Sequence, residues 1–183
     1  MASGTQTFIN EQLVISNGGS CYSIWSMNIE LVVVGKTDMK EVEALVSMYS
    51  KRLNHYVRFA ITVIADIRNT KKLSESEQKR LEGEAILRLV TDADHLMLLD
   101  EHGAELRSLE FAELIQKRMS SGVKRLVFVI GGPYGFSDAV YQRANSKLSL
   151  SKMTFSHQIV RAIFTEQLYR AFTILKNEPY HHE

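Results

Sequence analysis

Short β-branched segments alternate with helical patterns along most of this chain. Apolar residues recur at helical spacing in the stretches between these segments, as Val42, Leu45, Val46 and Tyr49 do. The segments with the composition of buried strands are NIELVVVG (28–35), VRFAITVIA (57–65), HLMLLD (95–100), RLVFVIGG (125–132) and LSLS (148–151). Strands that alternate with helices are joined by crossovers and lie parallel. We predict an α/β fold with a mostly parallel sheet and helices on both faces.

The composition fits one soluble domain. The chain has 183 residues, of which 45% are hydrophobic, and its net charge is +1. Cys21 is the only cysteine, which excludes an intrachain disulfide and a multi-cysteine zinc site and fits a cytoplasmic location. No segment approaches the roughly 20 apolar residues of a membrane span. We therefore expect a cytoplasmic protein without contact to membranes.

The first 26 residues differ in character from the rest. They are rich in Ser, Gly and Thr, and they precede Met27, which opens directly into the first predicted strand. Such a stretch contributes no periodic apolar core. We predict that residues 1–26 form an extension outside the fold and that residues 27–183 form a single domain.

Three predicted strands end in polar or Gly-rich segments, where ligands of open parallel sheets bind. These ends are Leu99-Asp100, followed by EHG as a turn, IGGPYG (130–135) and LSKMTF (150–155). IGGPYG has neither the dinucleotide-binding spacing nor the Lys of a P-loop. Gly131 and Gly132 lack a Cβ, so a flat ligand can approach the backbone closely. A tight turn into a helix capped by Ser137 explains the same residues equally well.

Several other kinds of active site are absent from the sequence. There is no G-x-S-x-G elbow, no H-E-x-x-H and no acidic cluster spaced for magnesium. The tail His181-His182-Glu183 contains metal-binding residue types, but the sequence places no further ligand beside it. We expect no metal site.

The predicted final helix, residues 157–176, is apolar over more than one stripe, which favours burial against its own sheet and a second body. His157 and Arg161 are four residues apart and share a face near its start. A capping His and a surface Arg explain this pair without any function. A net charge of +1 is weak evidence for binding of nucleic acid by charge alone; if RNA is the partner, local basic patches and shape must recognise it. Basic clusters, which are equally explained as ordinary solvated surface, lie at Arg68, Lys71 and Lys72 and at Lys117, Arg118, Lys124 and Arg125.

Four segments together resemble a known family. FVIGGPYGF, LSLSKMTFSHQIVRAIFTEQLYRAF, NEPYHHE and the opening NIELVVVGK resemble the RlmH family. Its members are SPOUT-class methyltransferases that modify N3 of a pseudouridine in bacterial 23S ribosomal RNA. The resemblance covers residues 27–183, with the middle helices matched only loosely.

The resemblance implies a C-terminal trefoil knot of the SPOUT type, in which three loops hold S-adenosylmethionine. Carried onto this chain, the cofactor residues are Leu99, Gly131, Leu150, Ser151, Lys152, Met153, Thr154 and Phe155. The helix over residues 157–176 is then the interface of a homodimer. The implied partner is 23S ribosomal RNA within the ribosome.

The resemblance also implies catalytic residues, which are Arg170, Tyr180 and His181. Arg stabilises a uracil anion, Tyr stacks on or hydrogen-bonds to a base, and His accepts a proton. His157, Arg161 and His182 are implied contacts to the substrate.

Two positions depart from the family pattern. Ser156 replaces a common Pro, and Ser can cap the helix instead. His182 stands where Arg or Lys is usual, so the contact to RNA phosphate differs at neutral pH.

Two alternative functions fit the same sequence. They are a SPOUT methyltransferase with another RNA target and a catalytically silent RNA-binding or ribosome-assembly module.

Overall fold

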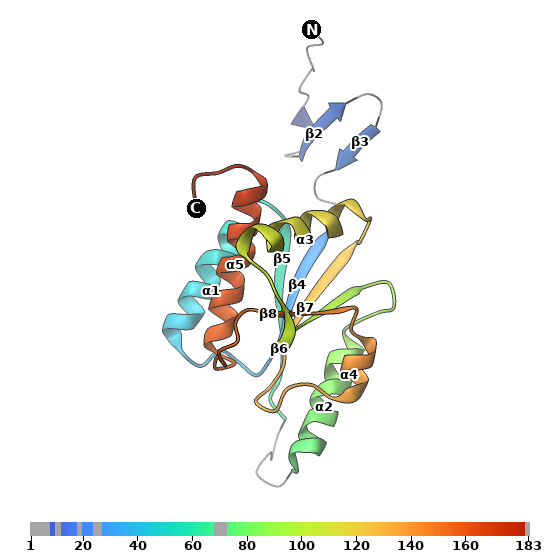
Figure 1. The fold of residues 1–183 in the computed structure, drawn as a ribbon, viewed down its shortest axis with the longest axis vertical. Coiled ribbons are helices and arrows are strands. Elements are labelled where there is room, and N and C mark those ends of the chain that lie inside the picture. The colour runs from blue at the N-terminus through green and yellow to red at the C-terminus, as the bar shows by residue number, and fades with distance from the viewer. Residues whose placement is uncertain (1–7, 10–11, 18–19, 24–26, 68–72, 182–183) are drawn as a thin grey trace.

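The structure is a computed structural model that describes residues 8–9, 12–17, 20–23, 27–67 and 73–181 (Figure 1). Its main sheet contains β4 (Asn28–Val34), β5 (Arg58–Ile64), β6 (His95–Glu105), β7 (Arg125–Ile130) and β8 (Ser146–Ser149). The helices are α1 (Lys40–Leu53), α2 (Glu75–Arg88), α3 (Ser108–Ser120), α4 (Asp138–Arg143) and α5 (Ile159–Leu175). None of the helices in these ranges is long and apolar enough to cross a membrane.

The main sheet has five strands in the order β5-β4-β7-β6-β8, and every neighbouring pair is parallel. The central strands β4 and β7 carry the β-branched runs because both of their faces are covered. Helices α1, α3 and α5 cover one face, and α2 and α4 cover the other (Figure 1). The predicted α/β fold, with a mostly parallel sheet between two helical layers, is confirmed. The trefoil knot stays a prediction.

Alternate residues of β4 point into the two layers. Ile29, Leu31 and Val33 belong to the core under α1, α3 and α5, whereas Val32 and Val34 belong to the core under α2 and α4. Both sets are almost completely buried. Neither face of this strand meets solvent, which explains why Leu31 to Val34 are apolar without interruption.

Helix α5 lies within the first layer, next to α1 and α3 (Figure 1). Its residues Phe164, Leu168 and Phe172 are buried in the same protomer, and the ring centroids of Phe164 and Phe128 are 4.7 Å apart. Ile159 is its large apolar residue that remains exposed. Val160, Ile163 and Leu175 remain half-buried. The helix is thus covered mainly by its own protomer, and its place in a dimer interface stays a prediction.

The strand β6 runs further than the sequence predicts. Residues Glu101 to Gly103 are not a turn, because β6 continues to Glu105 and pairs with β8 on both sides of a register shift between Leu99 and Ala104. A Cβ on Gly103 would lie 2.5 Å from the backbone carbonyl carbon of Leu148. The missing side chain at Gly103 thus permits close approach of the two backbones. The last strand is shifted as well, since β8 ends at Ser149.

The N-terminal residues form strands that the sequence did not predict. The strands β1 (Phe8–Ile9), β2 (Gln12–Asn17) and β3 (Ser20–Ser23) pair with one another in a small antiparallel sheet. In the described part of the chain this sheet is separate from the five-stranded one.

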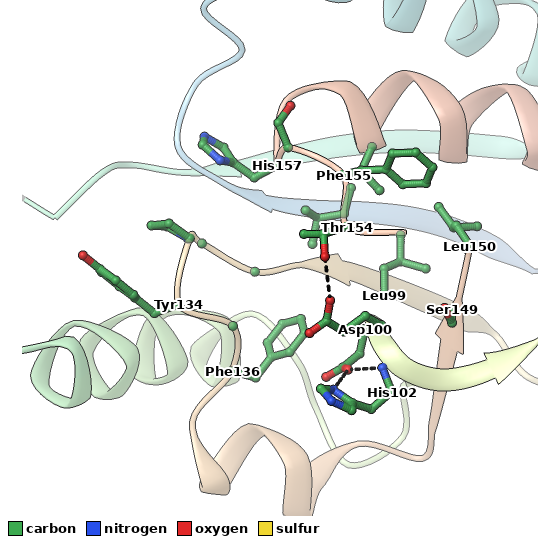
Figure 2. Close-up of a pocket in the computed structure, with 18 of the residues that line it drawn as sticks. Leu99, Asp100, His102, Tyr134, Phe136, Ser149, Leu150, Thr154, Phe155 and His157 are labelled. Atoms are coloured by element: carbon green, nitrogen blue, oxygen red, sulfur yellow. Dashed lines mark hydrogen bonds and ion pairs between the residues drawn. The ribbon is translucent and has the colours of Figure 1, made fainter. Parts of the chain in front are cut away.

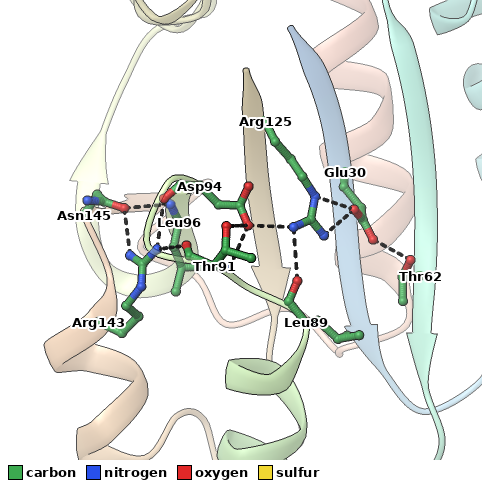
Figure 3. A network of polar contacts seen from close by, with 9 residues as sticks. All are labelled: Glu30, Thr62, Leu89, Thr91, Asp94, Leu96, Arg125, Arg143 and Asn145. Carbon is green, nitrogen blue, oxygen red and sulfur yellow. Dashed lines mark hydrogen bonds and ion pairs between the residues drawn. The ribbon is translucent and has the colours of Figure 1, made fainter. Parts of the chain in front are cut away.

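A polar network ties the end of the sheet opposite the Gly-rich loops together (Figure 3). Arg125 donates to Glu30 Oε2 at 2.7 Å, to Asp94 Oδ2 at 2.7 Å and to the carbonyl oxygen of Leu89 at 3.0 Å. Thr62 donates to the other oxygen of Glu30. Arg125 therefore binds three segments of its own chain and is not a free cation of the basic cluster that the sequence suggests.

Candidate active site

A cavity of about 640 Å³ opens at the carboxyl ends of β6, β7 and β8 (Figure 2). Its walls come from the middle of β6, from the residues after β7 and β8, and from the segment that leads into α5. The residues that line it include Leu99, Asp100, His102, Gly131, Gly132, Tyr134, Phe136, Tyr141, Leu150, Ser151, Met153, Thr154, Phe155 and His157. The three strand ends that the sequence singles out therefore meet at one site.

The Gly-rich loop after β7 forms one wall. A Cβ on Gly131 would lie 3.1 Å from Cε1 of Phe136, and a Cβ on Gly132 would overlap the carboxylate of Glu82. The N–H of Gly135 donates to the carbonyl oxygen of Gly132 at 3.2 Å and closes the loop. Ser137 is the N-cap residue of α4. The loop is a tight turn into a helix and also a wall of the cavity, but the Ser137 side chain accepts no capping hydrogen bond. Its role as a ligand loop stays a prediction.

The loop after β8 forms the facing wall. The N–H of Met153 donates to Ser151 Oγ at 2.9 Å, and Thr154 Oγ1 donates to Glu101 Oε2 at 3.2 Å. All the expected cofactor residues line the cavity except Lys152. The Lys152 ammonium lies 3.7 Å from Glu105, and its side chain is 86% exposed.

Asp100, His102 and Tyr141 also line the cavity, although the sequence did not indicate His102 or Tyr141. Asp100 accepts hydrogen bonds from the His102 N–H, at 2.7 Å, and from the Tyr141 hydroxyl. Burial alone would raise the pKa of Asp100, but hydrogen bonds from Tyr141 and His102 outweigh it and hold that pKa below its ordinary value. Burial and the Asp100 carboxylate raise the pKa of Tyr141. Asp100 is therefore a charged acceptor and Tyr141 a neutral donor.

His157 and Arg161 lie in different environments despite their spacing. His157 lines the cavity, whereas Arg161 is 1% exposed. The Arg161 guanidinium donates to the carbonyl oxygens of Val34, at 2.7 Å, and Gly35, at 3.0 Å. Arg161 is therefore not in the candidate site. Ser156 Oγ accepts a hydrogen bond from the N–H of Ile159 at 3.2 Å, but the N-cap residue of α5 is Gln158, whose side chain makes no capping hydrogen bond.

The expected catalytic residues Arg170 and Tyr180 meet at a different place. Glu166 Oε1 accepts hydrogen bonds from Arg170, at 2.6 Å, and from the Tyr180 hydroxyl, at 3.0 Å. Arg170 Cζ also lies 4.7 Å from the centroid of the Tyr180 ring. Burial, with hydrogen bonds to Tyr49 and Glu166, raises the pKa of Tyr180. Tyr180 is therefore a neutral hydrogen-bond donor.

This tail cluster (Glu166, Arg170, Tyr180 and His181) is far from the cavity in the protomer. Val160 lies in the wall of the cavity, and Arg170 is 10 positions further along α5, which corresponds to about 15 Å. Nδ1 of His181 is buried without a hydrogen-bond partner among the described residues. His182 lies outside the described residues. Within the described ranges, no group of three or more His, Cys, Asp or Glu side chains is arranged to hold a metal ion.

The sequence and the fold both have known counterparts. Residues 27–181 match the family model described as "Predicted SPOUT methyltransferase". A protein of Christiangramia forsetii named Ribosomal RNA large subunit methyltransferase H is 64% identical over 156 residues, which are 85% of this chain and 99% of that protein. Proteins of the same name from Flavobacterium psychrophilum and Parabacteroides distasonis are 59% and 56% identical, and each match covers 86% of this chain and 100% of the relative.

A solved structure of a probable methylase family protein from Haemophilus influenzae Rd KW20 has a similar fold. The TM-score is 0.50 at 12% sequence identity, and the match covers 86% of this chain and 71% of that one. At this identity the likeness concerns the fold alone.

Proposed function

Because the chain belongs to the SPOUT methyltransferase family, we propose that it transfers a methyl group from S-adenosylmethionine to N3 of a pseudouridine in 23S ribosomal RNA. The observation that carries this proposal is that Leu99 to His102 of β6 meet the loops after β7 and β8 around one cavity, in a chain 64% identical to a ribosomal RNA methyltransferase. The substrate we propose is the assembled ribosome, because a net charge of +1 favours a shaped site over free RNA.

The residues present at the cavity fit S-adenosylmethionine. Leu99, Phe136 and Leu150 offer apolar surface to a flat base, and Gly131 lets that base approach the backbone. The Asp100 carboxylate adds negative charge near a cofactor that carries a sulfonium. When bound, S-adenosylmethionine supplies an electrophilic methyl group, and no metal is needed for its transfer.

The tail cluster supplies the groups that the acceptor nitrogen requires. N3 of the pseudouridine must lose its proton. The reaction therefore needs a proton acceptor and a cation that stabilises the resulting anion. Tyr180 is held protonated beside Glu166 and therefore acts as a hydrogen-bond donor. We assign the role of proton acceptor to His181, whose Nδ1 has no partner among the described residues, and the stabilisation of the uracil anion to Arg170.

We propose that the active enzyme is a homodimer in which the tail cluster of one subunit completes the cavity of the other. The cavity and the tail cluster lie at opposite ends of α5, so one protomer does not bring them together. Leu45 and Met48 on α1 and Ile159 on α5 expose apolar surface that a second copy can cover.

The decisive experiment maps methylated nucleotides in 23S ribosomal RNA. Ribosomes from cells that lack the protein are incubated with purified protein and S-adenosylmethionine, and N3 methylation of one pseudouridine is the expected result. Methylation of another nucleotide would support a different RNA target. Absence of both methylation and cofactor binding would support the silent module.

We also propose that residues 27–183 carry this activity in the cytoplasm, where ribosomes are present. A chain without residues 1–26 is expected to methylate ribosomes at the parent rate. Loss of activity on this truncation would show that the small N-terminal sheet contributes to the enzyme.

A further inference from the structure

A buried carboxyl group lies against the backbone of the Gly-rich loop. Glu82 of α2 is 4% exposed and does not line the cavity. Gln78 Nε2 donates to its Oε1 at 2.8 Å. Its Oε2 has no hydrogen-bond partner among the described residues. Among the described residues, only one of the two carboxyl oxygens of Glu82 therefore accepts a hydrogen bond.

The loop backbone rests on this carboxyl. A Cβ added to Gly132 would overlap Oε2 of Glu82 and would lie 2.8 Å from Oε1. The next residue of α2 makes a second close contact, because a Cβ on Gly83 would lie 3.1 Å from Cβ of Ser137. Helix α2 therefore supports the loop at Gly132 and again where α4 begins.

The electrostatic surroundings of Glu82 make its burial unfavourable. Burial raises its pKa, and the Asp66 carboxylate adds to the rise; Gln78, the Gly132 N–H and His157 act in the opposite direction. The Gly132 N–H thus faces the carboxyl, although it does not reach ordinary hydrogen-bond geometry with Oε2. An apolar side chain would fill this space at lower cost. A carboxyl here fits a role beyond packing.

We propose that Glu82 is a positioning residue of the methyltransferase, which holds the loop from Gly131 to Gly135 in the shape that receives the cofactor. The carboxyl lies against the loop backbone at Gly132, and the residues of the same loop line the cavity. This inference rests on the proposed cofactor site. Its effect is on cofactor affinity, because Glu82 reaches neither the cavity nor the tail cluster.

Two variants of Glu82 separate positioning from packing. Glu82→Gln keeps the shape and an acceptor oxygen, so it is expected to bind S-adenosylmethionine within about 3-fold of the parent chain. Glu82→Ala removes the support and is expected to bind at least about 10-fold more weakly, since small displacements of a positioned group are costly. The control is Glu84→Ala, which removes a half-exposed carboxyl of the same helix. Calorimetry gives the affinities, and kinetics should show a raised KM for the cofactor with an unchanged KM for ribosomes.

A double-mutant cycle tests the contact itself. Gly132→Ala places a methyl group against Glu82, so it should weaken cofactor binding by about 10-fold or more in the parent chain. The same change should have a much smaller effect beside Glu82→Ala, where the space is vacant. The cycle remains informative if Glu82→Ala alone lowers thermal stability, because the methyl group of Gly132→Ala then fills part of the space that Glu82 vacates.

The outcomes distinguish this inference from the proposed function. Equal affinity of the parent and Glu82→Ala chains, or additive effects in the cycle, would overturn the positioning role and leave the methyltransferase proposal intact. A parent chain that does not bind S-adenosylmethionine at all would overturn both.

Discussion

Arg161 Nη2 donates a 2.7 Å hydrogen bond to the carbonyl oxygen of Val34, which joins the first turn of α5 to the last residue of β4. Nη1 of the same guanidinium reaches the carbonyl oxygen of Gly35 at 3.0 Å and Thr37 Oγ1 at 2.9 Å. The start of α5, and with it His157 in the wall of the cavity, is thereby attached to the centre of the sheet.

Replacing this guanidinium should destabilise the whole domain. Arg161→Met leaves the carbonyl oxygens of Val34 and Gly35 buried without a donor, and each such group costs about 1–3 kcal/mol. We expect the free energy of unfolding to fall by roughly 2–4 kcal/mol, measured by urea denaturation. Arg161→Lys retains one cation and should lose less. A chain with Arg161→Met that is as stable as the parent would contradict the anchoring contact.

A side chain at Gly131 should interfere with the cofactor. The β-carbon of Gly131→Val begins 3.1 Å from the Phe136 ring, so its methyl groups must enter the cavity or displace that ring. We expect affinity for S-adenosylmethionine to fall at least about 10-fold, which is 1.4 kcal/mol, and stability to fall by about 1–3 kcal/mol from overpacking. Calorimetry measures the first and thermal melting the second. Unchanged affinity in the folded variant would remove Gly131 from the cofactor site.

Asp94 should make stability depend on pH in the acid range. Burial alone would raise its pKa, but hydrogen bonds from Thr91 and the charge of Arg125 outweigh burial and hold that pKa below its ordinary value. Its contribution is therefore complete above about pH 3.9, the pKa in an unfolded chain, and is lost as pH falls through the lower folded value. Asp94→Asn should be less stable than the parent near neutral pH, and the difference should shrink below about pH 3.9. Urea titrations at several pH values test this, and a constant difference would contradict it.

Mixed dimers test the composite site. A chain that lacks residues 180–183 keeps the cavity but loses Tyr180 and His181, so it should bind S-adenosylmethionine within a few-fold of the parent and fail to methylate ribosomes. A Gly131→Val chain keeps the tail but has a blocked cavity. A heterodimer of the two contains one site with an intact cavity and an intact partner tail, so mixing should restore part of the activity. An inactive mixture, with heterodimers demonstrated by mass, would argue against the shared site.

The strand and helix periodicities by themselves determined the class of fold. A run such as Leu31 to Val34 is apolar without interruption, and that pattern suits a strand buried on both faces. The polar or Gly-rich residues that follow the third, fourth and fifth predicted strands are likewise recognised from local composition, although β6 in fact continues to Glu105 and β8 ends at Ser149. The carboxyl ends of parallel strands lie at one edge of a sheet. The meeting of Leu99, Gly131 and Leu150 could therefore be predicted, and the motif resemblance indicated S-adenosylmethionine as the expected cofactor.

Only the tertiary structure decided which polar side chains belong to the site. The spacing of His157 and Arg161 predicts that they are neighbours. Arg161 is instead buried, and it donates a hydrogen bond to the carbonyl oxygen of Val34, 127 positions earlier in the chain. The extension of β6 beyond Asp100 depends on its pairing with β8. Glu82 lies against Gly132 because α2 packs against the loop that follows β7. Periodicity describes only neighbours along the chain, whereas burial and hydrogen bonding depend on contacts between distant segments.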